Sequence, residues 1–419
     1  MKPTPITAIT AASSLLLALA LPACGQPAQL PTEGPSPIFS DSEADAPPAT
    51  GYATQTLIDG LNRPWAVAFL PDGAVLITQR PGGIVIALPD GQGGFGEPVA
   101  VANAPESAAL GQGGMMDVVL HPEFASNGLV YLTYATGDGR ANRTVLSRAR
   151  LVRDESGTRF EDVQELYRVT PDKPGGQHFG SRLVWLPDGT LLMSVGDGGN
   201  PPTEVGGRLA RENPQYLDNT WGKVLRFNDD GAAPADNPFA DNQEHPETAK
   251  FIYSYGHRNI QGMAIDPATG NVWATEHGAL GGDELNLIEP GQNYGWPEAT
   301  YSIHYNRREI SEHVTLEGMI DPALVWTPVL AASGLAFYTG EAFEQWQGDL
   351  FAGGLVSRQV RRVMLGGVDG AGVDQNIEIM GNQTLAFEAR IRDVRQGLDG
   401  FLYVLTDSRN GELIRIVPE

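Results

Sequence analysis

The densest polar stretch of the chain covers residues 254–262 and reads SYGHRNIQG. It places an imidazole, a guanidinium and two amides between glycines, so hydrogen-bond donors can surround a planar polar ligand from several directions. In the alternative interpretation the stretch is an ordinary turn, in which Arg258 and Asn259 satisfy backbone carbonyls. Composition alone leaves both interpretations open.

His178 is the candidate for proton transfer. It lies within residues 175–182, GGQHFGSR, where the flanking glycines allow a substrate to approach closely. The imidazole titrates near neutrality, which suits a general base. An isolated histidine is more often a satisfied polar residue, so this segment does not settle the role by itself.

A third segment, residues 275–286, interleaves carboxylates with glycines and reads TEHGALGGDELN. Carboxylates and inward-turned backbone carbonyls are the ligands that a hard cation such as Ca²⁺ requires. Zinc would need more histidine or cysteine at regular spacing. The competing interpretation is an acidic turn exposed to solvent.

Two further segments supply an amide and two arginines. Gln112 lies in the stretch GQGGMMD (111–117), and Arg390 and Arg392 alternate in ARIRDV (389–394). On an extended strand the two arginines share one face and would clamp a carboxylated ligand, although alternating surface arginines have the same pattern. The sequence contains no glycine-rich phosphate loop, Gly-x-Ser-x-Gly elbow or Cys/His nucleophile pair, which disfavours nucleotide and acyl-enzyme chemistry.

The elements that must position these residues form a repeat. A strand-like segment, a turn built on Pro, Asp, Asn or Gly, and a second apolar strand recur at 66–78, 121–132, 183–194, 262–275, 335–352 and 394–405. Such turns suit hairpins between adjacent strands. Each unit is long enough for four strands and a loop, so we predict an all-β, six-bladed β-propeller of four-stranded antiparallel blades. A β-sandwich is the alternative.

Composition agrees with this fold class. The 51 glycines and 31 prolines indicate many tight turns, and 41% hydrophobic residues suffice for a sizeable core. The formal net charge of −23 repels polyanions, so nucleic acid is not an expected partner. The single cysteine excludes an internal disulfide.

The N-terminus carries signals of export. Its apolar run from 14 to 21 has the length of a signal-peptide core, and the sequence LPAC ending at Cys24 resembles a bacterial lipobox. A plain secretory signal is the alternative. We predict a signal peptide over 1–23, a lipidated Cys24 with a flexible tether over 24–50, and the propeller over 51–419. The protein would be periplasmic and would reach the membrane only through its N-terminal lipid.

From about Leu61 to Ile416 the chain resembles the PQQ-dependent soluble aldose sugar and glucose dehydrogenases, the glucose/sorbosone dehydrogenase family. The resemblance rests on RPW (63–65), GQGG (111–114), HFG (178–180), GHRN (256–259), EHG (276–278), NYGWP (293–297) and RIRDV (390–394). The family is built on a six-bladed propeller and uses pyrroloquinoline quinone (PQQ) with calcium. An aldose sugar is the implied substrate, oxidised at its anomeric carbon to a lactone.

The resemblance also implies residue roles. His178 would be the general base, and Arg258 would stabilise charge on the quinone oxygens. The implied PQQ ligands are Gln112, His178, Arg258, Asn259, Gln261, Arg390 and Arg392. The cofactor-bridging calcium would take the carbonyls of Gly278 and Ala279, and a second, structural calcium would take the Glu284 side chain and the Tyr294 carbonyl.

One position departs from the family pattern. Where many members have a PQQ-contacting lysine, this chain reads GGLVSR over 353–358, with Val356 nearest and Arg358 as a possible substitute. We therefore expect weaker cofactor binding, which titration of the apoprotein with PQQ measures. A calcium-dependent propeller hydrolase such as a lactonase and a non-catalytic sugar-binding propeller are the rival functions. The preferred sugar, the electron acceptor and the choice between monomer and homodimer stay open.

Overall fold

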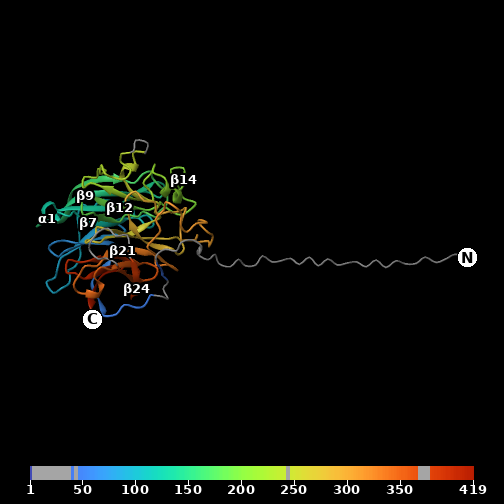
Figure 1. Cartoon of the computed structure of the whole chain (residues 1–419). Coiled ribbons are helices and arrows are strands. Elements are labelled where there is room, and N and C mark those ends of the chain that lie inside the picture. The colour runs from blue at the N-terminus through green and yellow to red at the C-terminus, as the bar shows by residue number, and fades with distance from the viewer. Residues whose placement is uncertain (2–38, 42–45, 242–245, 367–377) are drawn as a thin grey trace.

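Each of the six repeated hairpins forms the first two strands of a four-stranded antiparallel blade (Figure 1). The prediction of a six-bladed β-propeller is therefore confirmed, and the β-sandwich alternative is wrong. The computed structural model describes residues 1, 39–41, 46–241, 246–366 and 378–419.

The first three blades follow one another along the chain. Blade 1 contains β3 (Pro64–Phe69), β4 (Val75–Gln79), β5 (Ile84–Ala87) and β6 (Val99–Ala100). Blade 2 contains β7 (Met115–Leu120), β8 (Leu129–Gly137), β9 (Asn142–Asp154) and β10 (Gly157–Arg168). Blade 3 contains β11 (Leu183–Trp185), β12 (Leu191–Val195), β15 (Lys223–Phe227) and β16 (Ile252–Tyr255).

The other three blades complete the ring. Blade 4 contains β17 (Ile260–Ile265), β18 (Val272–Glu276), β19 (Asp283–Ile288) and β20 (Leu324–Trp326). Blade 5 contains β21 (Ala332–Phe337), β22 (Leu350–Gly354), β23 (Gln359–Gly366) and β24 (Glu378–Ala386). Blade 6 contains β25 (Ile391–Gln396), β26 (Leu402–Thr406), β27 (Gly411–Pro418) and, from the N-terminal side of the chain, β2 (Tyr52–Leu61).

Pairing of β2 with β27 closes the ring. Tyr52 lies opposite Pro418, and Leu61 lies opposite Gly411. The blue and red ends of the propeller therefore meet beside the C-terminus in Figure 1. Because the outer strand of blade 6 comes from the other end of the domain, the ring cannot open without breaking this sheet.

Little of the described chain is helical. The short elements are α1 (Phe124–Asn127), η1 (Ala210–Gln215), η2 (Ala249–Phe251) and η3 (Glu344–Trp346), beside the small hairpin of β13 (Glu204–Val205) and β14 (Arg208–Leu209). No helix in the described ranges is long and apolar enough to cross a membrane.

The hydrophobic core is divided among the seams between neighbouring blades. Six clusters of buried side chains each draw on two adjacent blades, and the one between blades 2 and 3 contains Tyr131 and Trp221, both fully buried. Apolar side chains that leave water here are worth about 25 cal/mol per Å² of buried surface. Each blade is therefore stabilised chiefly by its neighbours.

In four blades a hydroxyl on the second strand ties the blade to the inner strand of the next blade or to the residues just before that strand. Each hydroxyl donates to a backbone carbonyl across the seam: Thr78 to Met116 (2.6 Å), Thr133 to Ser181 (2.8 Å), Ser194 to Ile260 (3.3 Å) and Thr275 to Ser333 (2.7 Å). Several of them also accept a backbone N–H within their own blade, as Thr133 does from Asp117 at 3.0 Å. They thereby satisfy backbone groups where the inner strand is irregular.

Blade 5 uses a different residue for the same task. Its second strand has Gly353 at this position, and an added Cβ there would lie 2.6 Å from the Ser333 hydroxyl. Ser333 instead donates to the Ile391 carbonyl of blade 6 at 2.7 Å. The small Gly353 thus makes room for the hydroxyl that joins blades 5 and 6.

The chain before the propeller contacts it at two places. In β1 (Phe39–Asp41) the backbone pairs in parallel with β20, and the Ala49 N–H donates to the Thr384 carbonyl at 2.9 Å. These described residues fall within the predicted tether. The predicted signal peptide after Met1, Cys24 and the rest of the tether lie outside the described residues.

We expect Thr133→Val to lower the free energy of unfolding by about 1–3 kcal/mol, because it leaves a buried carbonyl and a buried N–H without partners. Urea unfolding followed by circular dichroism measures this loss. Thr56→Val, on the exposed face of β2, is the control and should change stability little. Equal stability of the two variants would show that the seam hydroxyls contribute nothing.

Candidate active site

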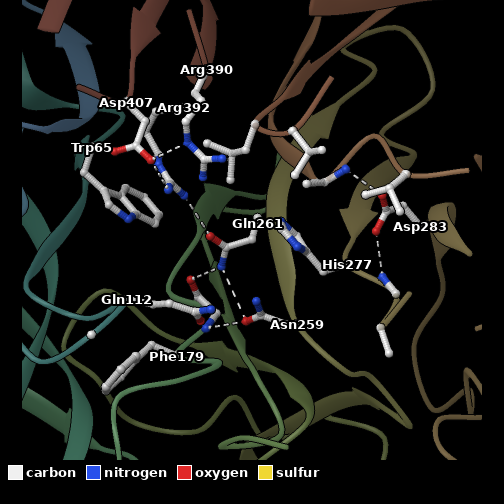
Figure 2. Close-up of a pocket in the computed structure, with 18 of the residues that line it drawn as sticks. Trp65, Gln112, Phe179, Asn259, Gln261, His277, Asp283, Arg390, Arg392 and Asp407 are labelled. Carbon is white, nitrogen blue, oxygen red and sulfur yellow. Dashed lines mark hydrogen bonds and ion pairs between the residues drawn. The ribbon is translucent and has the colours of Figure 1, made fainter. Parts of the chain in front are cut away.

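The predicted site segments meet in a cavity of about 470 Å³ at one end of the ring, where inner strands and their flanking loops converge (Figure 2). Residues from all six blades line it. The predicted residues in the lining are Gln112, Asn259, Gln261, Gly278, Ala279, Arg390 and Arg392. His178 and Arg258 are only 2% exposed and lie outside this lining, while Glu284 and Tyr294 line a separate, smaller cavity.

One wall of the cavity is cationic. The side chains of Arg390 and Arg392 both reach Asp407 at 3.3 Å, and Arg392 also donates to Gln261 at 3.2 Å (Figure 2). Burial alone would raise the pKa of Asp407, but the two guanidiniums outweigh burial and lower it. Arg80 adds a third guanidinium to the lining.

The amide side chains fix the loop that carries His178. Asn259 accepts the Gly180 N–H at 3.1 Å, Gln261 donates to the Gly180 carbonyl at 3.0 Å, and Gln112 accepts the His178 N–H at 2.8 Å. The residues predicted as ligands therefore also position the imidazole. His178 itself has a positive φ of 48°, an uncommon conformation that these bonds hold in place.

The imidazole of His178 is held as a free base. Its Nδ1 lies 2.6 Å from Asp197, whose other oxygen accepts the Trp296 indole N–H at 2.9 Å. Nδ1 therefore carries the proton, and Nε2 keeps its lone pair, 3.4 Å from the Arg258 guanidinium. Burial, and then the charge of Arg258, lower the pKa of His178 against the opposing effect of Asp197.

Arg258 fits both interpretations of its segment. Its guanidinium donates to the carbonyls of His277 at 3.0 Å and Gly278 at 2.6 Å, as the turn interpretation requires. The same group lies 3.4 Å from the Nε2 atom of His178 and 5.3 Å from the centre of the Trp296 ring, which the ligand-binding interpretation allows. Its Nε is buried without a hydrogen-bond partner among the described residues.

A buried pair beneath the site supports this segment. Glu276 accepts the backbone N–H groups of Arg258 and Asn259, and its other oxygen lies 3.0 Å from His257 Nδ1. The far side of the His257 ring bonds to Ser254 at 2.8 Å. His257 and Glu276 therefore act as structural residues, which explains the repeated imidazoles and carboxylates in the two predicted segments.

The turn between β18 and β19 forms the opposite wall. Asp283 accepts the N–H groups of Gly278 at 2.8 Å, Leu330 at 2.9 Å and Ala331 at 2.6 Å. The Ala279 N–H donates to Ser302 at 3.1 Å. This network presents the Gly278 and Ala279 backbone to the cavity, where the sequence predicts cation-binding carbonyls.

Glu284 and Tyr294 meet in a small polar cavity of about 10 Å³, the size for one water or ion. Glu276 lines the same space. Burial, and then the nearby charge of Glu276, raise the pKa of Glu284 to about 8. The lining holds two buried carboxyl groups against one guanidinium, that of Arg258, and this excess of negative charge favours a cation. Among the described residues no three His, Cys, Asp or Glu side chains form a metal-binding group.

Four residues in or next to the site were not among the predicted site residues. Asp197 orients the imidazole, Arg80 adds positive charge, and His277 lines the cavity with Nε2 buried and unpartnered within the described chain. Burial, Arg258 and Arg392 lower the pKa of His277 to about 3, so this ring stays neutral. Lys173 is buried behind the His178 loop. The motif EHG contains His277, but nothing in the sequence pairs Asp197 with His178.

Val356 lines the cavity where the family pattern has lysine, whereas Arg358 is exposed and lies outside the lining. The cationic substitute expected as a possibility at Arg358 is therefore absent from this wall. Leu280, Val329 and Leu355 lie in the same lining and make this part of the cavity apolar.

The ends of the inner strands surround a cationic cavity, and a buried imidazole in its free-base form lies beside it. The protein therefore belongs to the class of all-β propellers whose central cavity has the features of an enzyme site. The chain matches the model of the glucose / sorbosone dehydrogenase family over residues 61–415. It belongs to that family.

Named relatives agree with this assignment. The chain is 40% identical to aldose sugar dehydrogenase YliI of Escherichia coli over 377 residues, covering 89% of this chain and 94% of the relative. The apo structure of the soluble aldose sugar dehydrogenase of E. coli superposes with a TM-score of 0.76 at 36% identity, covering 88% of this chain and all of that one. A PQQ-bound aldose sugar dehydrogenase of Streptomyces coelicolor gives 0.66 at 27% identity, with coverage of 88% and 100%.

Proposed function

We propose that this protein is a PQQ- and calcium-dependent aldose sugar dehydrogenase that oxidises the anomeric carbon of its substrate to a lactone. The observation that carries the proposal is a cavity lined by three arginines, together with the imidazole of His178, which is kept as a free base beside Arg258. The PQQ-bound state of one structural relative supports the choice of cofactor. We further propose that the protein is exported and anchored through Cys24.

The cavity fits PQQ chemically. PQQ carries three carboxylates, and the lining offers Arg80, Arg390 and Arg392, although the whole chain has a net charge of −23. The Nε atoms of Arg258 and Arg392 are buried donors without partners in the described part of the chain. A polyanionic planar ligand would satisfy such donors, so Gln112, Arg258, Asn259, Gln261, Arg390 and Arg392 would hold it.

Calcium has two proposed positions. Next to the cofactor it would take the carbonyls of Gly278 and Ala279; the Gly278 oxygen accepts one hydrogen bond from Arg258, which leaves its second lone pair available. The structural calcium would take Glu284 and the Tyr294 carbonyl in the small cavity.

Residues of the chain itself would accept the proton that the substrate loses. When bound, PQQ supplies the two-electron acceptor for the hydride that leaves the anomeric carbon. His178 Nε2 would take the proton of the anomeric hydroxyl, and Asp197 would stabilise the imidazolium that results. Arg258, 3.4 Å from that nitrogen, would stabilise negative charge that develops on the acceptor oxygens. The C1–H and O–H bonds break, and the carbonyl of the lactone forms.

Dye reduction by purified protein tests the proposal. With glucose, reduction should require both PQQ and Ca²⁺, and methyl glucoside should give none because it lacks a free anomeric hydroxyl. Equal rates with and without PQQ would contradict the assignment. Release of acid from a lactone, with no dye reduction, would favour the calcium-dependent lactonase, and sugar binding without either reaction would favour a binding protein.

Replacing His178 with Ala should lower turnover by about two to four orders of magnitude, the usual contribution of a positioned base. PQQ binding, followed by its absorbance, should remain. His313→Ala changes an exposed histidine and serves as the control. Unchanged turnover in His178→Ala would remove this residue from the role.

Replacing Glu284 with Gln should remove the part of the Ca²⁺-induced rise in unfolding temperature that comes from the structural site, because ligand binding stabilises only the folded state. Cation binding needs the ionised carboxyl, whose pKa is raised to about 8. The stabilisation by Ca²⁺ should therefore increase from pH 6 to pH 9 in the parent. Glu317→Gln, at an exposed site, should respond like the parent. A response to Ca²⁺ in Glu284→Gln as large as that of the parent would place the structural ion elsewhere.

A further inference from the structure

Lys173 is a buried lysine with no assigned task. It lies between β10 and β11, and its backbone exchanges two 2.9 Å hydrogen bonds with Asn142. Its side chain is fully buried, and Nζ has no hydrogen-bond partner within the described chain. The nitrogen lies 3.8 Å from the centre of the Phe179 ring and 5.7 Å from that of Trp221.

This side chain packs behind the pair of His178 and Asp197. Phe179 directly follows the histidine in sequence, and Gly198 directly follows the aspartate. An added Cβ at Gly198 would lie 3.1 Å from Lys173 Cδ, so the lysine stem touches that turn. Asp197 is the carboxylate that acts on the amine, and Arg258 is the other cation that faces the imidazole.

A charged amine at this place costs folding free energy, and its charge depends on pH. An ammonium that loses water without gaining a hydrogen bond is destabilised, apart from the attraction of the two aromatic faces. Burial lowers the pKa of Lys173 to about 7, against the opposing effect of Asp197. Below that pH the site holds a positive charge close to the carboxylate that also holds His178.

Lys223, on β15 of blade 3, shows how a structural buried lysine is satisfied in this protein. It is equally buried, but its Nζ donates to the carbonyls of Asn213 at 3.0 Å, Pro214 at 3.0 Å and Trp221 at 2.8 Å. A lysine kept only for folding therefore has acceptors in this protein. Lys173 has none within the described chain, and the carboxylate that acts on its amine, Asp197, belongs to the site.

We propose that Lys173 is a positioning residue that acts through Asp197: its ammonium competes with the protonated imidazole of His178 for the charge of that carboxylate. His178 thereby loses its proton more readily after each turnover. The effect on turnover rests on the proposed function, whereas the effect on the imidazole does not.

The sign of the effect follows from the charges. His178 titrates below its ordinary range, where Lys173 is protonated, so the two positive charges repel. Removing the amine should raise the pKa of His178 by about one unit, the low end for a neighbouring charge. The acid limb of the pH profile of kcat/KM should move up by the same amount, so the variant is about tenfold slower well below that limb.

The experiment compares Lys173→Met with Lys223→Met in the full chain. The titration of His178 is followed by NMR of labelled histidine rings, and the spectrum of His178→Gln identifies its signal among the seven histidines. We expect the His178 midpoint to rise in Lys173→Met and to stay at the parent value in Lys223→Met. This measurement stands even if the protein oxidises no sugar, which separates the two proposals.

Stability separates a positioning role from a structural one. Lys173→Met should unfold at the same or higher urea concentration than the parent, because it removes an unpaired buried amine. Lys223→Met should unfold earlier, because three carbonyls lose their donor. An unchanged His178 midpoint in Lys173→Met, with a loss of stability like that of Lys223→Met, would overturn the proposal.

Discussion

Two arginines and two aspartates at the centre of the ring connect its closure to the site. Arg182, 1% exposed, contacts Asp117 at 3.3 Å and Asp393 at 2.9 Å, and Arg395 contacts the same carboxylates at 2.8 and 3.0 Å. Buried charges are costly unless each finds its partner with good geometry. Because these four residues come from blades 2, 3 and 6, the cluster is satisfied only when those inner strands lie in register.

The same cluster supports residues that line the cavity. Arg182 donates to the backbone carbonyl of Gln261 at 2.9 Å, and the side chain of Gln261 holds the Gly180 carbonyl and accepts from Arg392. The guanidiniums of Arg182 and Arg392 both lie over the Trp65 ring, at 4.4 and 6.0 Å. The arginine wall and the His178 loop are therefore fixed by one network. A site whose binding side chains are held in place in this way needs little reorganisation when a ligand binds.

The sequence predicted what repeats and what clusters along the chain. Six hairpins with proline and glycine turns gave the blades, and glycine-flanked polar segments gave most of the cavity lining. The seam hydroxyls could also be predicted from the sequence, since Thr78, Ser194 and Thr275 end the second apolar runs of three hairpins. The pairing of Asp197 with His178 could not be predicted from the sequence, because it joins two loops through space and neither residue belongs to a periodic pattern.

The two sides of the cavity differ in how firmly the fold specifies them. Trp65, Gln261 and Arg392 lie on inner strands, whose register the central cluster and the seams determine. The apolar side comes from loops, with Leu280 in the turn before β19, Val356 after β22, and Tyr305 61% exposed in the long connection before β20. Loops tolerate substitution better than packed strands. In the proposed function Gln261 and Arg392 would therefore hold the cofactor from strands that the fold fixes, whereas the side chains of the apolar side can change without disturbing the propeller.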